Sequence, residues 1–555
     1  MESLEDRRVL ALLTVFSFGD SGPGTLRDAI TQANAMPGAD SIQFISAGTI
    51  VLASGDLVIR DSLTVNPAGL GITIQAANAH RVFTVDDGDA LPDVVVSLKG
   101  FTLSQGGSNA TAGFLGGAIL NTEQLSLQAM TITESTASFG GGLANVGRGV
   151  LTASQLALSG NSALYGGGAV FNGADSKLTI TDGKVTGNTA GAKNGSKYSS
   201  FGGGLYSSGD LTLTNVTFSS NVATHLNPSV GGLGGGLSVR GNGDKSNGGF
   251  DAVLHNVSLE ANLAQLGGGL HVGAGDTSLV NSVVSGNTGT RGGGLFVTGR
   301  LSVVQTTVDT NLANDLPGLL SSGGAAFVGP MGELTMDDSF VNDNRTQGRG
   351  GAIYASSLGA VEPARVTVRG SSISGNIAGS LGGGFSAGYA AELTIENSQI
   401  DSNLAPLRGG GIYVSSFGST LQPSLIVRGS TISGNTAAKS LGGGINLGTR
   451  ASAEIENSVI RDNQAYDRGG GIYASNFAMG LGGSPSTLVI QGSQILNNSL
   501  TATKGASLGG GLMAGTNLQV TITNTTIADN DADANTTVSG AGGGAYLSAF
   551  GTTQT

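Results

Sequence analysis

The chain of 555 residues contains no cysteine. This absence excludes disulfide bonds and thiolate metal sites, although it does not fix the redox compartment of the protein. Charged residues make up only 12% of the sequence, which is low for a disordered chain and for a coiled coil. A formal net charge of -12 leaves no basic stripe to neutralise phosphates, which argues against a nucleic-acid partner. No segment approaches the ~18 apolar residues of a membrane-spanning helix, so no transmembrane span is predicted.

Glycine, by contrast, is abundant and periodic. It accounts for 96 residues, about twice average usage, without the Gly-X-Y period of collagen. Gly-Gly-Gly or Gly-Gly-Ala triplets recur roughly every 24 to 40 residues, a self-similar period that is typical of solenoid proteins. At the triplets we expect backbone with positive φ or a close approach to the next coil, where a Cβ atom would clash. The triplets end at residues 118, 142, 168, 204, 236, 269, 294, 325, 352, 384, 411, 444, 471, 511 and 544.

A recurrent asparagine accompanies the triplets. Each of these asparagines follows an aliphatic or aromatic residue by three positions, as in Phe218-Ser-Ser-Asn221. An asparagine amide can satisfy buried polar backbone at a turn while it tolerates a left-handed conformation. Stacked in successive coils, such amides can hydrogen-bond to each other, so we predict an asparagine ladder. The positions are Asn161, Asn188, Asn221, Asn262, Asn287, Asn311, Asn344, Asn376, Asn403, Asn435, Asn463, Asn498 and Asn530.

Short strands are predicted between these markers. The repeat from Leu393 to Asn403 alternates aliphatic with polar side chains, the period of a half-buried strand, and Asn397-Ser398 marks a bend between two strands. Three faces per coil are therefore expected. We predict an all-β fold, a right-handed single-stranded parallel β-helix of about fifteen coils, with its repeats in residues 101–555. A leucine-rich-repeat horseshoe is disfavoured because the coils contain no helix-forming segment.

The N-terminal part differs from the repeats. Residues 1–15 carry a short apolar run preceded by acidic residues, and we interpret them either as an export or targeting segment or as a plain first strand. Residues 16–100 are predicted to form an N-terminal cap and the first coils. Within them we expect one helix, about Leu26 to Ala35, which Thr25 caps and which carries an apolar stripe. Such a helix would cover the open core of the first coil.

Groups that could perform catalysis are sparse. The four histidines lie in different coils without metal-ligand spacing. Asp337-Asp338 is the best local pair for a polysaccharide hydrolase, but turn or solvent-facing carboxylates on a strand are the favoured interpretation. Asp529, Asp531 and Asp533 could bind Ca²⁺ through oxygen, although the glycine of a calcium turn and a distal Glu are missing. We therefore predict no catalytic residue and no cofactor, with Ca²⁺ at these three aspartates as the alternative.

Arginine and tyrosine recur with a longer period of two coils. An arginine precedes every second glycine triplet between residues 349 and 468, and a tyrosine follows the same triplets. Because neighbouring residues of a strand point to opposite faces, a tyrosine after an inward isoleucine is expected to point outward. Tyrosines two coils apart would lie ~9.6 Å from each other, near the length of a disaccharide, and Tyr with Arg suits contact with glycans or proteins. The alternative is a stripe that merely covers the solenoid and pairs Arg with Glu. The candidate binding residues are Arg349, Tyr354, Arg408, Tyr413, Arg468 and Tyr473.

The order of hydrophobe-x-x-Asn and Gly-Gly-Ala-Ile resembles the repeats of polymorphic outer-membrane proteins, which are autotransporter adhesins. The segment from Asp20 to Phe44 resembles the N-terminal cap of exported bacterial β-helix proteins, and the segment from Leu4 to Leu10 resembles an N-terminal motif of large exported bacterial surface proteins. No β-barrel segment follows the last repeat, so autotransport by this chain alone is not expected, and a truncated polypeptide is one interpretation. The repeat strings that carry the first resemblance are Phe218-Ser-Ser-Asn221, Gly116-Gly-Ala-Ile119 and Gly350-Gly-Ala-Ile353.

These resemblances imply a secreted or cell-surface bacterial protein with an adhesin-like binding or scaffold function. Its lateral face is expected to contact glycans or proteins. Two alternative hypotheses remain open: a lyase or hydrolase that acts on an acidic polysaccharide, and an inert spacer within a larger surface protein. The lack of a convergent set of catalytic groups favours binding over catalysis.

Overall fold

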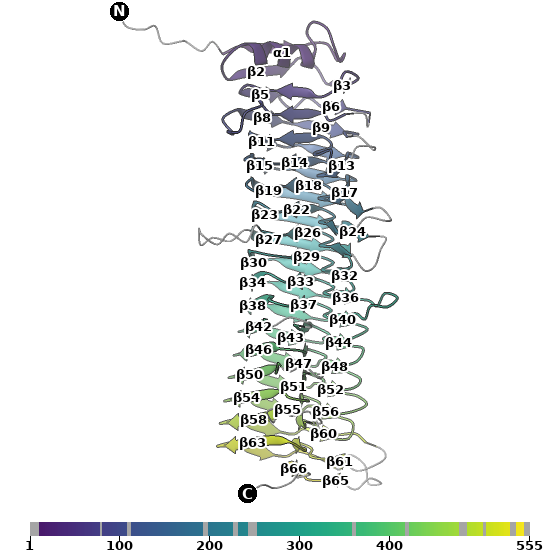
Figure 1. Cartoon of the computed structure of the whole chain (residues 1–555), viewed down its shortest axis with the longest axis vertical. Coiled ribbons are helices and arrows are strands. Elements are labelled where there is room, and N and C mark those ends of the chain that lie inside the picture. Colours follow the sequence, from purple (N-terminus) through teal and green to yellow (C-terminus); the bar gives the residue numbers. More distant parts are fainter. Residues whose placement is uncertain are drawn as a thin grey trace, which may run out of the picture. The chain divides into compact units, whose positions relative to one another are not determined.

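Two compact units make up the chain. The first comprises residues 1–265 and 269–277, and the second comprises residues 266–268 and 278–555. Each unit is a stack of short parallel β-strands, and the helix α1 (Leu26–Ala35) belongs to the first (Figure 1). The predicted all-β parallel solenoid is thus confirmed. The structure, a computed structural model, describes residues 10–77, 80–107, 113–192, 198–225, 231–241, 252–357, 362–416, 421–476, 486–502, 507–532 and 540–548.

One coil of the second unit shows how the repeats fold. It begins with β46 (Ala391–Glu396), bends at Asn397, where φ is 50°, and continues as β47 (Gln399–Asp401). The short strand β48 (Leu404–Ala405) and then β49 (Ile412–Val414) complete the coil. These strands belong to three separate sheets, the first of which contains both β46 and β47. The expected three faces per coil are therefore confirmed.

The middle sheet of each unit contains one three-residue strand per coil, and from residue 119 onwards each of these strands directly follows a glycine triplet. In the first unit its strands pair in the order β4 (Leu57–Ile59), β7 (Phe83–Val85), β10 (Ile119–Asn121), β14 (Leu143–Asn145), β18 (Val170–Asn172), β22 (Leu205–Ser207), β26 (Leu237–Val239) and β29 (Leu270–Val272). In the second unit the order is β33 (Leu295–Val297), β37 (Ala326–Val328), β41 (Ile353–Ala355), β45 (Phe385–Ala387), β49, β53 (Ile445–Leu447), β57 (Ile472–Ala474), β62 (Leu512–Ala514) and β66 (Ala545–Leu547).

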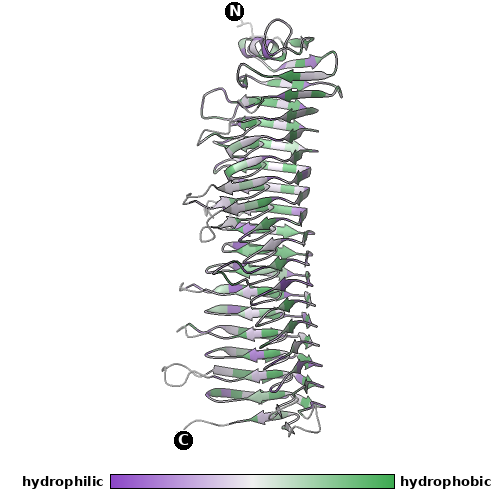
Figure 2. Ribbon diagram, turned by 90° about the vertical axis from the view of Figure 1, so that its right-hand side faces the viewer, coloured by the Kyte–Doolittle hydropathy of each residue, from purple (hydrophilic) through white to green (hydrophobic). Residues whose placement is uncertain are grey.

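The core of each coil is apolar and follows the alternation of the strands. In β46 the residues Leu393 and Ile395 are buried and Thr394 between them is partly exposed, whereas all three residues of β49 are buried. Figure 2 shows this alternation as green bands that recur along the strands. Because each coil places its aliphatic residues in register with those of the next coil, burial is continuous within a unit.

The helix α1 caps the first unit as expected. It runs from Leu26 to Ala35, and the side chain of Thr25 accepts a hydrogen bond from the backbone N–H of Asp28. Its buried stripe, which includes Leu26 and Ile30, packs near β1 (Leu12–Val15), β2 (Asp40–Phe44) and β4. Figure 1 shows α1 beside β2 at the start of this unit. Residues 1–9 lie outside the described part of the chain, so the export interpretation of residues 1–15 stays a prediction, while Leu12–Val15 forms a strand.

The asparagine ladder is confirmed in both units. Each side-chain amide donates to the side-chain oxygen of the asparagine in the next coil, as from Asn376 to Asn403 at 2.9 Å and from Asn435 to Asn463 at 2.9 Å. The same oxygen also accepts a hydrogen bond from the backbone N–H of the preceding ladder residue. In the first unit the ladder runs from Asn161 through Asn188 and Asn221 to Asn262. All of these side chains are buried, so the ladder supplies partners for polar groups that lack water.

A second ladder, of serines, was not anticipated. It sits at the bend within the first sheet, where the backbone N–H of Ser371 donates to the Ser398 hydroxyl at 3.1 Å and Ser398 repeats this contact with Ser430. Each hydroxyl in turn donates to the carbonyl two residues earlier, as Ser398 does to Glu396 at 2.7 Å. The Asn-Ser and Gly-Ser dipeptides thus serve two purposes. The first residue adopts positive φ, and the serine hydroxyl supplies hydrogen-bond partners for backbone N–H and carbonyl groups at the buried bend.

Candidate binding site

In the second unit the predicted Tyr413 lies near Arg408 and Arg349, but all three predicted tyrosines are covered. Their side chains leave the interior of the coil, yet Tyr354 is only 9% exposed, Tyr413 1% and Tyr473 2%. Tyr354 packs with Phe296 and Phe327 on the outer side of the middle sheet. The expectation of an outward, accessible tyrosine stripe is therefore wrong, because apolar neighbours on the same side enclose the rings.

The predicted arginines remain partly exposed. Arg408 donates a hydrogen bond to the Tyr413 hydroxyl. Burial raises the pKa of Tyr413 above its usual value, and the charges of Arg408 and Arg349 oppose this shift, so both guanidinium groups are near the phenol. Arg468 keeps 40% of its side-chain surface exposed. Arg349, Arg408 and Tyr413 are thus close to one another, and of these the arginines, and not the tyrosine, reach the surface. Whether the predicted residues bind a ligand stays a prediction.

Pairing of Arg with Glu occurs elsewhere, on the first sheet. Arg428 is 2.8 Å from Glu456 and 3.7 Å from Glu396, and Arg369 is 3.2 Å from Glu396. These charges lie on neighbouring strands, where opposite charges face each other across the sheet. The covering stripe that pairs Arg with Glu thus exists, but it uses a different set of arginines from the one beside the glycine triplets.

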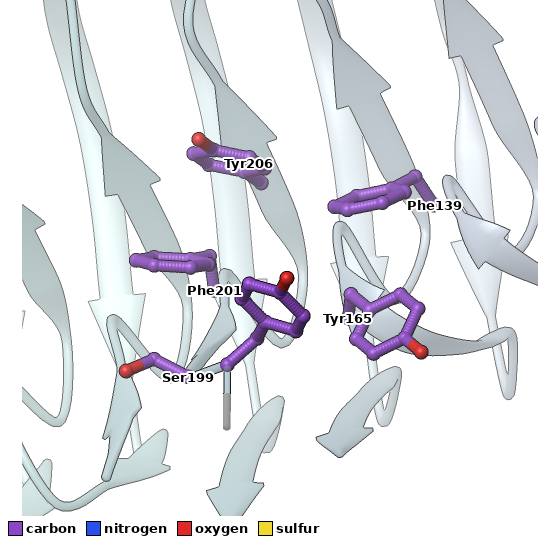
Figure 3. A pocket seen from close by; sticks show the side chains of 6 residues that line it. Phe139, Tyr165, Ser199, Phe201 and Tyr206 are labelled. Atoms are coloured by element: carbon purple, nitrogen blue, oxygen red, sulfur yellow. The ribbon is translucent and has the colours of Figure 1, made fainter. Parts of the chain in front are cut away.

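A pocket lined by aromatic residues opens in the first unit. Its volume is about 360 Å³. Figure 3 shows the rings of Phe201 and Tyr206 on one side, with Phe139 and Tyr165 facing them across the space. Tyr198 is 72% exposed and lies 6.3 Å from the Tyr165 ring, measured between ring centroids. The residues that line the pocket are Phe139, Tyr165, Tyr198, Ser199, Phe201 and Tyr206.

The pocket forms at the corner between the third and the middle sheet. Phe139 ends β13 (Thr136–Phe139), Tyr165 lies in β17 (Ser162–Gly166) and Phe201 in β21 (Ser200–Phe201), and these three strands pair in successive coils. Tyr206 comes from the middle-sheet strand β22. Parallel stacking of the coils therefore brings together rings that are far apart in the sequence.

Ring-to-ring contacts and one glycine hold the pocket open and ordered. The Phe201 and Tyr206 rings stack at 5.1 Å between centroids with 22° between their planes, and Phe139 lies 5.5 Å from Tyr165. A Cβ atom at Gly166 would lie 2.9 Å from Cδ1 of Tyr206 and 3.3 Å from Cδ1 of Phe139. Glycine at this position lets the two groups of rings approach each other. The rings are mutually supported and need little ordering when a ligand binds.

A cation and a buried histidine lie at one end of these rings. The Arg240 guanidinium lies 5.7 Å from the centroid of the Phe201 ring. Burial raises the pKa of Tyr206 above its usual value. The positive charge of Arg240 and a hydrogen bond from its side chain partly oppose this increase. Burial also lowers the pKa of His271 to about 3, with a further lowering by Arg240, so this imidazole is neutral at physiological pH. His271 contacts Ser238 at 2.8 Å and serves as a packed polar residue.

Asp337 and Asp338, the candidate pair for hydrolysis, lie in a strand and in the bend that follows it. Asp337 lies in β38 (Glu333–Asp337), 3.5 Å from Arg369, and Asp338 adopts φ of 47° at the following bend. This arrangement agrees with the favoured interpretation of the pair as strand and turn carboxylates. Asp529 and Asp531 are exposed near the C-terminal end of the described chain, whereas Asp533 lies outside the described residues, so Ca²⁺ binding there stays a prediction.

Acidic side chains do gather in a loop of the first unit. Carboxylate oxygens of Asp87, Asp89 and Asp93 come within 4.8 Å of one another, as do those of Asp86, Asp87 and Glu123. Several of them accept hydrogen bonds from backbone N–H groups two residues ahead, as Asp87 does from Asp89 at 2.9 Å. Burial raises the pKa of Glu123, and its hydrogen bond from Val94 opposes the shift. The acidic residues therefore lie close together because their side chains stabilise successive tight turns of the backbone.

The sequence contained an overlooked indication of the aromatic pocket. Aromatic residues make up only 5% of the chain, yet all five rings that line the pocket fall between residues 139 and 206. Phe139 and Phe201 occupy the position directly before a glycine triplet, where most other coils carry Arg or Leu. The arginine spacing also extends to Arg291, which was not predicted as a binding residue. Arg291 precedes a glycine triplet and lies 58 residues before Arg349.

A family model described as "Right handed beta helix region" matches two overlapping stretches, residues 320–478 and 389–553. The fold is a right-handed parallel β-helix. This agrees with the parallel register of the strands and confirms the predicted handedness and repeat type. The comparison with curated protein sequences finds no match.

Several solved structures are similar at low identity. The A-module of mannuronan C-5 epimerase AlgE6 from Azotobacter vinelandii is 13% identical, with 92% of this chain and 97% of that chain covered and a TM-score of 0.26. PfbA, a surface adhesin of Streptococcus pneumoniae, is 10% identical, with 86% of each chain covered and a TM-score of 0.18.

Proposed function

We propose that this chain is an extracellular, adhesin-like β-helix protein that binds carbohydrate through the aromatic pocket of its first unit. The observation that carries the proposal is the meeting of five aromatic rings around an open space of about 360 Å³. Such a volume lies within the usual range for pockets that bind small ligands, which are lined mainly by aromatic side chains with a few polar groups.

The chemistry of the lining suits a sugar ring. A sugar presents C–H groups on its faces and hydroxyl groups at its edge. The exposed face of Tyr198 and the partly exposed ring of Tyr165 can stack on the C–H face, while the tyrosine and Ser199 hydroxyls can exchange hydrogen bonds at the edge. Aromatic rings lose little conformational freedom on binding, so stacking on a preformed pair contributes directly to affinity.

Binding is proposed in preference to cleavage because the pocket is lined by aromatic and hydroxyl side chains and not by acids or bases. None of the described residues that line it is a carboxylate or a histidine. Glycoside hydrolysis uses two carboxyl groups on either side of the bond, and no such pair faces this space in the described part of the chain. The resemblance of the N-terminal segment and of the repeats to exported bacterial proteins supports an extracellular location.

A glycan array probed with the full chain tests the proposal, followed by calorimetry on the glycans that bind. Tyr165→Ala and Tyr198→Ala should each weaken binding by about 0.5–1.5 kcal/mol, the contribution of one stacked ring. Phe340→Ala is the matched control, because Phe340 is 53% exposed on the first sheet of the second unit. Absence of any bound glycan, or equal weakening by the control, would contradict the proposal.

A further inference from the structure

The second unit carries a column of arginines at the corner before its glycine triplets, which we call the arginine column. Parallel bridges connect its members from turn to turn, and between residues 349 and 381 the N–H of Gly350 donates to the Leu381 carbonyl at 2.9 Å. Arginine occupies every second turn. Since neighbouring strands lie ~4.8 Å apart, arginines two turns apart are separated by ~9.6 Å. The column contains Arg291, Ser322, Arg349, Leu381, Arg408, Leu441 and Arg468 in successive turns.

Neutral partners position these cations. The Arg291 guanidinium lies 5.5 Å from the centroid of the Phe327 ring, and Arg408 donates to the Tyr413 hydroxyl. Within the described part of the unit, no ion pair joins Arg291 or Arg408 to a carboxylate. At Arg468 the nearest carboxylate oxygen, from Asp467, is 4.0 Å away, and the Nε atom has no hydrogen-bond partner.

The first sheet of the same unit shows the contrast. There Arg365 lies 2.9 Å from Glu392, and Arg428 is surrounded by three glutamates at 2.8 to 3.7 Å. The charges of the first sheet are therefore cancelled locally, whereas Arg291 and Arg408 keep theirs. A protein with a formal net charge of -12 thus presents a regularly spaced line of positive charge along one corner.

We propose that the arginine column binds an acidic polysaccharide whose negative charge recurs once per disaccharide. The ~9.6 Å interval between arginines is near the length of a disaccharide, so each charged sugar can meet one guanidinium group. Leu381 and Leu441, each 8% exposed and thus largely buried, occupy turns between the cations and place no charge opposite the uncharged sugar. Nucleic acid fits less well, because each strand of B-DNA carries one phosphate every ~3.4 Å along the axis, a much closer spacing than that of the arginines.

This site is distinct from the aromatic pocket and does not depend on it. The test uses the full chain and hyaluronan fragments, which carry one carboxylate per disaccharide, with binding measured by calorimetry at several salt concentrations. The parent should bind, and its affinity should fall as salt is raised. Arg291→Gln together with Arg408→Gln should weaken binding about tenfold or more, with a shallower dependence on salt. Carboxyl-reduced hyaluronan, in which the acids are alcohols, should not bind.

The control removes the same two charges from the first sheet, as Arg365→Gln together with Arg428→Gln, and should leave hyaluronan binding unchanged. Equal weakening by both double variants would overturn the proposal, as would equal binding of carboxyl-reduced hyaluronan or equally tight binding of a single-stranded DNA oligonucleotide. Arg408→Lys, which keeps the charge, should retain most of the affinity of the parent. If the arginine variants bind normally while Tyr198→Ala loses glycans, this inference fails and the proposed function of the pocket stands.

Discussion

Asn403 donates its side-chain amide to the side-chain oxygen of Asn435 at 3.0 Å, and the same oxygen accepts the backbone N–H of Asn403 at 2.9 Å. One buried atom thus satisfies two donors of the preceding coil. Asn435 in turn donates to the carbonyl of Ile400 at 2.9 Å, so the two coils share a closed network. Removal of one member leaves groups in both coils without partners.

Asn435→Leu should therefore destabilise the protein by about 1–3 kcal/mol, the cost of buried polar groups that lose their partners. Thermal unfolding followed by circular dichroism measures the change. Gln464→Leu is the control, because it makes a similar substitution at an exposed position of β56 (Gln464–Ala465). Melting temperatures that are equal for parent, Asn435→Leu and control would count against a stabilising ladder.

The middle glycine of each triplet should tolerate alanine less well than the third. A Cβ atom at Gly410 would lie 2.5 Å from the Gly443 carbonyl oxygen and 2.5 Å from the backbone of Thr436. We expect Gly410→Ala to cost about 1–3 kcal/mol, because backbone must move to admit the methyl group.

Gly294→Ala is the matched comparison at a third position. Its Cβ would meet the Ala325 carbonyl oxygen at 2.9 Å, and alanine already occupies the third position at Ala325 and Ala352. The expected cost is smaller, below about 1 kcal/mol. A larger loss of melting temperature for Gly294→Ala than for Gly410→Ala would contradict this account of the triplets.

Stability near the N-terminal cap should depend on acid pH through Asp20. Partial burial raises the pKa of Asp20, but hydrogen bonds from Ser54, Arg27 and Ala53 outweigh it and bring the pKa down from 3.8 to about 2. A lowered pKa in the folded state means that Asp20 stabilises the fold above pH 3.8 and that this contribution disappears as pH falls towards 2. The contribution is at most about 2 kcal/mol, because the carboxylate keeps some contact with water.

Asp20→Asn should therefore lower the melting temperature at neutral pH and have little effect near pH 2. Amide hydrogen exchange at Ala53 and Ser54, whose N–H groups donate to Asp20 at 3.0 and 2.8 Å, reports the change locally. A difference between parent and variant that persists unchanged at pH 2 would show that the charge of Asp20 is not responsible.

The aromatic pocket should respond to a change that removes no ring. Gly166→Ala would place a Cβ atom 2.9 Å from Tyr206, so the stacked rings must shift and glycan affinity should fall by up to about tenfold. The chain has 9 tyrosines and no tryptophan, so tyrosine fluorescence reports ligand binding directly. Gly191→Ala, whose Cβ would make only contacts of 3.5 Å or more, is the control. Unchanged affinity in Gly166→Ala would argue against the pocket as the glycan site.

Much of the fold could be predicted from local residue patterns. Thr25, the stripe from Leu26 to Ala33 and the boundaries of α1 followed from capping and helical spacing, because these interactions join residues a few positions apart. The ladder from Asn376 to Asn463 was equally predictable, since one residue type recurs at one turn in every coil. The serine ladder was missed because its hydroxyls were assigned to the bend alone, without their contacts to the next coil.

The candidate sites were predicted less completely. Spacing alone brought Arg408 and Tyr413 together correctly, but alternation along a strand says only that Tyr413 leaves the interior, not whether other side chains then cover it. The aromatic pocket was missed because Phe139, Tyr165 and Tyr206 come from three coils of unequal length, and their meeting depends on the register between those coils.

The sequence by itself determined the repeat: the period of the coil, its buried asparagines and the glycines at which an added Cβ atom would clash with the backbone. These features are local, because each follows from the hydrogen-bonding capacity or the backbone freedom of a single residue type at one turn. Only the tertiary structure decided which outward residues reach the surface. The partial exposure of Arg408 beside a buried Tyr413 and the opening between Tyr165 and Phe201 depend on how side chains of successive coils pack against one another. The spacing of residues within any single coil does not determine that packing.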